Sequence, residues 1–256
     1  MSTPGPCWEP ESFPPSRWNT VPVIQVQAEL RNVFENWGLP DRIRVDNGTP
    51  WGSIGDFPTE LSLWLIGLGV DVVWNPPAQP QKNGSVERSQ GVGKNWAEPR
   101  TCSNMQELQR RLDKFDEIQR AVYPAFGKQT RLQTFPEVSK PRRRYKQTKE
   151  RKLWNWKRVL ERLSEYSSPR KVDCSGEIYI YGRRRFVGKK HSGTTVMVAL
   201  DPDSREWEIS TVQGTVIRHQ PAPELAVDRI LSMDVTLKTP PQKVNAKTRT
   251  GKKRIT

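Results

Sequence analysis

Two acidic residues, Asp46 and Glu87, stand where a pair of carboxylates could hold divalent metal ions. Asp46 follows the short β-run 43–45 and precedes an Asn-Gly turn, and Glu87 lies just inside a helix that is expected to start near residue 83. A nuclease that uses two Mg²⁺ ions needs carboxylates from separate elements, because the ions clamp the attacking and leaving oxygens of one phosphate. The pattern therefore favours metal-dependent chemistry at a phosphate, with Asp46 and Glu87 as catalytic residues and metal ligands.

The segments that must position these two acids alternate between helical and extended patterns. Apolar residues recur at helical spacing in three segments and form short β-runs in two. The expected elements are a helix over 20–37, a strand over 42–46, a helix over 58–68, a strand over 70–74 and a helix over 83–97. This alternation is typical of an α/β layer fold, with Asp46 at a strand end and Glu87 in the first turn of a helix.

Each carboxylate also has a purely structural interpretation. An Asp in front of Asn-Gly commonly caps a turn, and a Glu in the first turn of a helix is favoured by the helix dipole. The interpretation as metal ligands depends on both motifs occurring together and in this order.

The segments WGLPDRIRVDNGTPWGS and PPAQPQKNGSVER resemble the core of the DDE transposases, which are related to retroviral integrases, and are nearest to bacterial insertion-sequence transposases. In that family Asp-Asn-Gly carries the second catalytic Asp and Asn-Gly-x-Val-Glu-Arg carries the catalytic Glu, which correspond here to Asp46 and Glu87. The resemblance implies an α/β ribonuclease-H-like core over 20–130, strand transfer at DNA ends, and Mg²⁺ or Mn²⁺ as cofactor. It further implies transposon ends and target DNA as partners, a homo-oligomer, and a bacterial cytoplasmic, nucleoid-associated location.

The first catalytic Asp of the family has no counterpart in this pattern. In the family it sits on an early strand ahead of a helix like 20–37, whereas residues 1–19 are rich in proline and are expected to be irregular. The resemblance therefore predicts a partial core that lacks its first strands. Two hypotheses follow: a truncated DDE-type transposase that is inactive alone, or a non-catalytic DNA-binding remnant that competes with or regulates an intact transposase.

Positive charge is concentrated in the second half of the chain. The net charge is +14, and residues 131–256 hold 29 basic and 13 acidic residues, whereas residues 1–130 carry a net charge of −2. Such asymmetry favours a polyanionic partner such as DNA, the alternative being a solvated surface. The stretch 140–158 holds ten Lys or Arg against a single acid and turns helical toward its end, so 131–172 is expected to be a basic helical linker.

The chain beyond this stretch changes to short β-runs separated by turn residues. The pattern predicts a small antiparallel barrel or sandwich over 173–234 and a disordered basic tail over 235–256. The resemblance favours the barrel, since many transposases carry a small all-β barrel after the catalytic core. The basic residues expected to bind DNA flank Glu87 or lie in the basic clusters; they are Lys82, Arg88, Lys94, Arg142, Arg143, Arg144, Lys146, Arg183, Arg184 and Arg185.

Composition excludes several other classes of protein. The mean hydropathy is −0.77 and no apolar run is long enough to span a membrane, so a membrane protein is not expected. The three cysteines are widely spaced, and the two histidines have no neighbouring cysteine pair. This pattern fits reduced thiols in a cytosol and neither a disulfide framework nor a zinc site.

Overall fold

The computed structural model describes residues 22–52, 55–76 and 84–233. The predictions for the irregular segment 1–19, for the tail 235–256 and for Lys82 fall outside these residues. The five elements expected between residues 20 and 97 each have a counterpart in the described chain, with boundaries that differ by a few residues. The structure also contains elements that the sequence pattern did not predict.

The N-terminal part of the described chain is a small α/β unit. Its elements are α1 (Val23–Trp37), β1 (Arg42–Val45), α2 (Glu60–Gly67) and β2 (Asp71–Trp74). The two strands pair in parallel, with Arg42 opposite Asp71 and Val45 opposite Trp74. The Thr59 side chain caps α2 by accepting a hydrogen bond from the backbone N–H of Ser62. The apolar residues of α2 are buried on all of its faces, so this helix is the centre of the fold.

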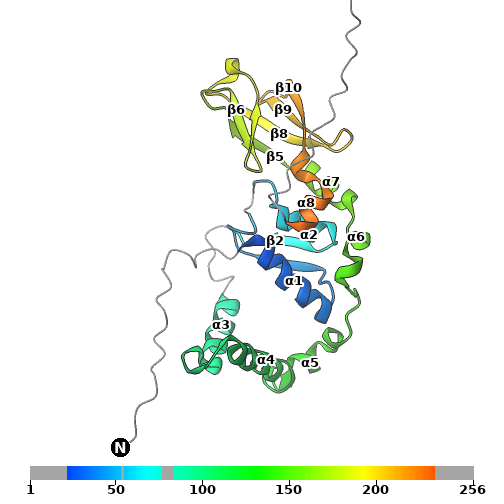
Figure 1. Ribbon diagram of the computed structural model, residues 1–256. Coiled ribbons are helices and arrows are strands. Elements are labelled where there is room, and N and C mark those ends of the chain that lie inside the picture. Colours follow the sequence, from blue (N-terminus) through cyan, green and yellow to red (C-terminus); the bar gives the residue numbers. More distant parts are fainter. Residues whose placement is uncertain (1–21, 53–54, 77–83, 234–256) are drawn as a thin grey trace, which may run out of the picture.

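A second helical group follows and lies below the α/β unit in Figure 1. It comprises α3 (Gly84–Ala97), α4 (Met105–Ala121), the short strands β3 (Pro124–Phe126) and β4 (Gln129–Thr130), and α5 (Arg131–Thr134). The buried ring of Phe115 on α4 packs against Trp96 of α3, with ring centroids 6.0 Å apart. The Arg120 guanidinium lies 4.2 Å from the centroid of the Trp37 ring and joins α4 to the end of α1.

The segment expected to be a basic linker packs closely against the α/β unit. It contains α6 (Glu150–Leu153) and α7 (Trp156–Ser164), and α7 lies between α2 and the strand β8. Trp154 is buried against Gly67 of α2, where an added Cβ would lie 2.0 Å from the indole nitrogen. The backbone N–H of Asn155 also donates to the carbonyl of Gly67 over 2.9 Å. A side chain at position 67 would therefore force this segment away from α2.

The C-terminal part is built on an open four-stranded antiparallel sheet in the order β10-β9-β8-β5. Its strands are β5 (Ser167–Lys171), β8 (Thr195–Asp201), β9 (Glu206–Thr211) and β10 (Val216–Pro221), and β6 (Glu177–Ile180) pairs separately with β7 (Arg183–Phe186). The helical assignment for 131–172 was wrong at β5, which is an edge strand of this sheet. The sheet is not closed among the described residues, and a barrel stays a prediction. The helix α8 (Val227–Ser232) was not predicted.

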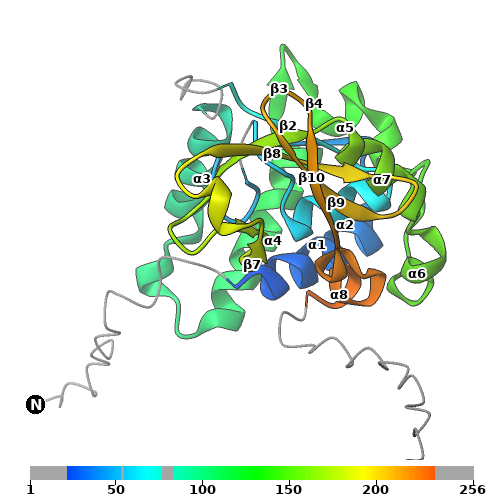
Figure 2. The ribbon, with the colours of Figure 1, turned by 90° about the horizontal axis from the view of Figure 1, so that it is seen from above.

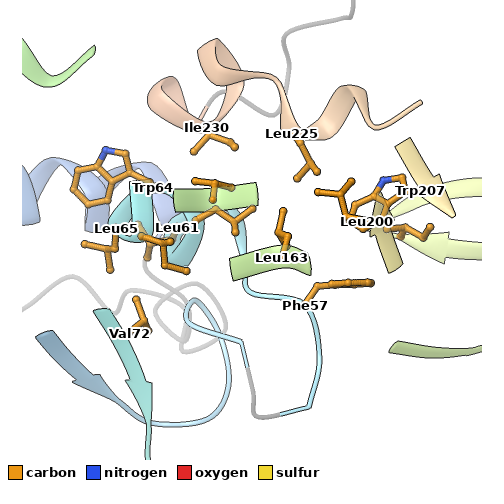
Figure 3. Close-up of a cluster of buried hydrophobic side chains, with 14 of the residues drawn as sticks. Phe57, Leu61, Trp64, Leu65, Val72, Leu163, Leu200, Trp207, Leu225 and Ile230 are labelled. Atoms are coloured by element: carbon orange, nitrogen blue, oxygen red, sulfur yellow. The ribbon is translucent and has the colours of Figure 1, made fainter. Parts of the chain in front are cut away.

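One cluster of buried hydrophobic side chains joins these parts. Figure 3 shows members from α2, α7, α8 and the sheet meeting in one core, and its labels mark Phe57, Leu61, Trp64, Leu65, Val72, Leu163, Leu200, Trp207, Leu225 and Ile230. Seen from above in Figure 2, the four-stranded sheet lies over α2. The core thus continues across the predicted boundaries after 130 and after 172. The buried Ala97 and Phe115 of α3 and α4 lie outside this cluster.

Candidate functional site

Asp46 lies directly after β1, at the carboxyl end of the parallel strand pair, and its side chain is exposed. The next residue fixes the turn to the neighbouring strand, because the Asn47 side-chain amide donates a 2.7 Å hydrogen bond to the carbonyl of Asn75, just after β2. Gly48 and Gly52 exchange two backbone hydrogen bonds of 2.6 and 2.8 Å. Ligands commonly bind at the carboxyl ends of parallel strands, so Asp46 stands at a suitable place on a fixed turn.

Glycine is required at position 48 by the backbone of this turn. Gly48 has a φ of +126°, a value that side-chain-bearing residues rarely adopt. The indole N–H of Trp74 donates to the carbonyl of Trp51 over 3.1 Å, which ties the far side of the turn to β2. The Asp-Asn-Gly motif therefore has a clear conformational basis, which is also what a purely structural turn would need.

Glu87 lies in the first turn of α3 and its side chain is exposed, as are those of Arg88 and Lys94 on the same helix. The first helical turn favours a carboxylate whatever its further role. Lys94 is in the last turn, where a cation interacts favourably with the helix dipole. The structural and the catalytic interpretation of Glu87 are both compatible with this position.

Asp46 and Glu87 have the donor chemistry that Mg²⁺ or Mn²⁺ requires, since both offer carboxylate oxygens to solvent at the ends of separate elements. Among the residues the structure describes, no group of three or more His, Cys, Asp or Glu side chains gathers in a way that could hold a metal ion. Metal binding at Asp46 and Glu87 therefore stays a prediction, supported by the donor types and by the place of Asp46.

The four basic residues of the stretch 142–146 differ in their surroundings. Arg143 is held by the protein, since its guanidinium donates to the carbonyls of Pro40 and Leu68 over 2.8 Å each. Arg142 is 80% exposed and forms a 3.1 Å ion pair with Asp41. Arg144 and Lys146 are exposed and form no ion pair among the described residues. Of these four side chains, those of Arg142, Arg144 and Lys146 are exposed.

The arginines of the β6–β7 hairpin divide in the same way. Arg185 is 8% exposed and forms an ion pair with the buried Glu224, in which a single guanidinium nitrogen, Nη2, lies 2.6 Å from both carboxylate oxygens. Its guanidinium is enclosed, so we do not retain Arg185 as a DNA-contacting residue. Arg183 is partly exposed and lies 3.9 Å from Glu224, whereas the Arg184 side chain is 69% exposed. Arg184 is the most exposed of the three, although it lies 3.6 Å from Glu177.

A cavity beside the Asp46 turn and a groove beside β5 and β6 were not expected from the sequence. A cavity of about 340 Å³ lies beside the Asp46 turn, lined by Gly48, Pro50, Glu60 and Met233 among others. A larger groove of about 690 Å³ lies between the start of α2 and the strands β5 and β6. Its lining combines residues more than a hundred positions apart, so no local sequence signal marks it.

Comparison with known families adds no assignment. No family model matches the chain. The resemblance carried by the Asp46 and Glu87 motifs therefore stays a prediction. No helix in the described ranges is both long enough and apolar enough to cross a membrane.

Proposed function

We propose that this chain is a DNA integration or transposition protein of the DDE type, with Asp46 and Glu87 as ligands of divalent metal. The observation that carries the proposal is the position of Asp46 at the carboxyl end of β1, in a turn tied to Asn75 after β2. A metal-binding carboxylate needs such fixed support, because phosphoryl transfer depends on accurate positioning of the reacting oxygens.

Each group in this proposal has its own role. Asp46 and Glu87 would hold Mg²⁺ or Mn²⁺, which when bound activates the attacking oxygen and stabilises the leaving oxygen of a DNA phosphate. The exposed Arg88 and Lys94 on α3 would bind the phosphates of a transposon end or of the target next to Glu87. The basic side chains of 142–146 and of the β6–β7 hairpin would bind further along the backbone of the same DNA. A homo-oligomer and a nucleoid-associated location accompany this proposal.

The proposal is tested by titrating the full chain with Mn²⁺ and following heat release, with and without a DNA duplex. We expect Asp46→Asn and Glu87→Gln each to weaken Mn²⁺ binding at least tenfold, because an amide is a poorer ligand than a carboxylate. Asp41→Asn is the matched control, since Asp41 is an exposed carboxylate at the other end of β1. Equal Mn²⁺ affinity in all four proteins would overturn the metal assignment.

A second function is favoured by the exposed basic side chains, which do not depend on the two carboxylates. Arg142, Arg144 and Arg184 face solvent, and a protein with such groups can bind DNA without cutting it and compete with an active transposase. Nicking and strand-transfer assays in Mg²⁺ and Mn²⁺ separate the two functions. Because the first catalytic Asp of the family has no counterpart in the sequence, we expect no activity from the chain alone. Activity that disappears in Asp46→Asn would mean that another residue supplies this ligand and would favour the catalytic function, whereas DNA binding without any activity is compatible with the regulatory one.

A further inference from the structure

The groove between α2 and the β6–β7 hairpin has a floor whose polar groups are already paired. The Arg170 guanidinium donates to Asp56 over 2.5 Å and to the Ser168 hydroxyl over 2.6 Å. Burial would raise the pKa of Asp56, but the hydrogen bonds from Arg170 and from the backbone N–H of Phe57 hold it below its usual value. Glu60 accepts a 2.7 Å hydrogen bond from Arg229. Each floor carboxylate therefore has an arginine of its own.

The aromatic residues of the floor give it a fixed shape. The ring of Phe57 stacks on Tyr181 and packs against Trp207, with ring centroids 6.2 and 5.0 Å away. The Tyr181 hydroxyl donates to the carbonyl of Pro58 over 2.6 Å. This hydrogen bond joins the end of β6 to the segment before α2. The two sides of the groove are therefore held together by the packing of the fold.

The rim of the groove presents an exposed aromatic ring and exposed basic side chains. Tyr179 lines the groove and is 48% exposed. The Arg184 guanidinium lies 5.7 Å from the centroid of that ring and donates to its hydroxyl over 2.8 Å. Lys171 also lines the groove and is exposed, without an ion pair among the described residues. Arg184 does not line the groove itself but adjoins it through Tyr179. It lies 3.6 Å from Glu177 and remains 69% exposed.

We propose that this groove binds an unpaired nucleotide of a DNA strand, with the base stacked on Tyr179 and the adjoining phosphates bound by Lys171 and Arg184. The inference rests on the proposed DNA-binding function. It adds that the β6–β7 hairpin binds an unpaired part of the DNA. An exposed aromatic ring beside cations is the arrangement that binds single strands without regard to sequence. The volume of about 690 Å³ lies within the usual range of about 300–1,000 Å³ for small-ligand sites.

The charge of the lining favours a nucleic acid over a basic peptide. The floor pairs Asp56 with Arg170 and Glu60 with Arg229, so an arginine compensates the charge of each floor carboxylate. The charges at the rim are the cations of Lys171 and Arg184 together with the carboxylate of Glu177. A polyanion with flat bases satisfies both the cations and the ring.

The experiment measures binding of the full chain to two labelled probes by fluorescence anisotropy: a blunt duplex, and the same duplex with a short unpaired overhang. We expect the overhang probe to bind about tenfold tighter than the blunt duplex, because one stacked base contributes a gain of this order. Tyr179→Ala removes this advantage and Tyr179→Phe keeps it. Phe186→Ala is the control, since Phe186 is 44% exposed on the same hairpin beneath Arg218 but lies outside the groove lining.

The outcomes separate this inference from the proposed function. Binding of the blunt duplex without an overhang advantage, or an advantage that survives Tyr179→Ala, overturns the groove proposal alone. Absence of binding to both probes overturns the groove proposal and the DNA-binding function together. A labelled oligolysine peptide whose binding depends on Tyr179 would assign the groove to a peptide instead. Thermal unfolding of each variant verifies that Tyr179→Ala is folded at the assay temperature.

Discussion

Arg185 and Glu224 form an ion pair in which both side chains are buried, with the Glu224 carboxylate fully enclosed and also accepting a 2.6 Å hydrogen bond from the Trp207 indole. The pair joins β7 to the 3₁₀ helix Pro223–Leu225 that precedes α8. Removing one member would leave an uncompensated charge in the core.

The first prediction follows from this pair. We expect Arg185→Met to lower the free energy of unfolding by about 3–5 kcal/mol, which is typical for breaking a buried pair. Lys190→Ala, an exposed change four residues after β7 ends, should alter it by less than about 0.5 kcal/mol. Denaturant titration of both variants measures the difference. Similar values for the two variants would contradict the structural role of Arg185.

The second prediction concerns the packing of the segment 150–164 on α2. An alanine at position 67 places its Cβ against the Trp154 ring, so Gly67→Ala should lower the free energy of unfolding by about 1–3 kcal/mol. Gly91 is the matched control, because it lies in the middle of α3 with nothing within 4 Å of an added Cβ. Gly91→Ala should raise helix stability by about 1 kcal/mol, and opposite signs in thermal unfolding are the expected result.

The sequence predicted those elements whose signal is local. Helical spacing of apolar residues located α1 and α2, and short β-runs located β1 and β2. Strand β5 was missed because its sequence, SSPRK, has no apolar alternation. Ser168 is buried there, and the polar side chain of Arg170 reaches Asp56, more than a hundred positions earlier in the chain. Only the folded chain brings such partners together.

The basic residues of the candidate site also have partners that the sequence could not predict. Composition correctly indicated where the positive charge is concentrated, but neighbouring arginines in one run have different roles. Arg185 meets an acid 39 positions later, and Arg143 meets carbonyls of Pro40 and Leu68. Such distant partners leave no mark in the local pattern, so the sequence alone does not separate exposed arginines from those held by the protein.

The third prediction concerns alkaline pH. Burial raises the pKa of Tyr181 well above its usual value, and the carboxylates of Glu60 and Asp56 raise it further. Tyrosine in an unfolded chain ionises at about pH 10. The folded state therefore retains the Tyr181 hydroxyl proton at a pH where the unfolded state loses it. The stability from Tyr181 is therefore complete below about pH 10 and is lost as the pH rises through the raised pKa.

Urea unfolding between about pH 8 and pH 11 measures this effect. We expect the free energy of unfolding of the wild-type chain to fall above about pH 10. Tyr181→Phe should be less stable at neutral pH by about 1 kcal/mol, because its hydrogen bond to Pro58 is removed. Its decline at alkaline pH should be shallower, and parallel curves for the two proteins would refute the role of Tyr181.

The fourth prediction separates two kinds of basic residue within the stretch 142–146. Arg144 and Lys146 are exposed, so changing both to Ala should weaken binding to all duplex sequences alike, since phosphate contacts carry no sequence information. If each of these side chains binds one phosphate, each substitution should make the slope of log affinity against log salt shallower by about 0.9. Arg143→Ala should leave that slope unchanged and lower the free energy of unfolding by about 1–3 kcal/mol, because it removes two hydrogen bonds from a charged group.

Both effects of these substitutions are measured by anisotropy titrations at several salt concentrations, paired with denaturant unfolding. The full chain must be used, because the core runs through residues on both sides of position 131 and neither half would keep its packing alone. A salt slope that is the same for the wild-type chain and for the Arg144 and Lys146 double variant would show that these two side chains are hydrated at the surface and do not contact DNA.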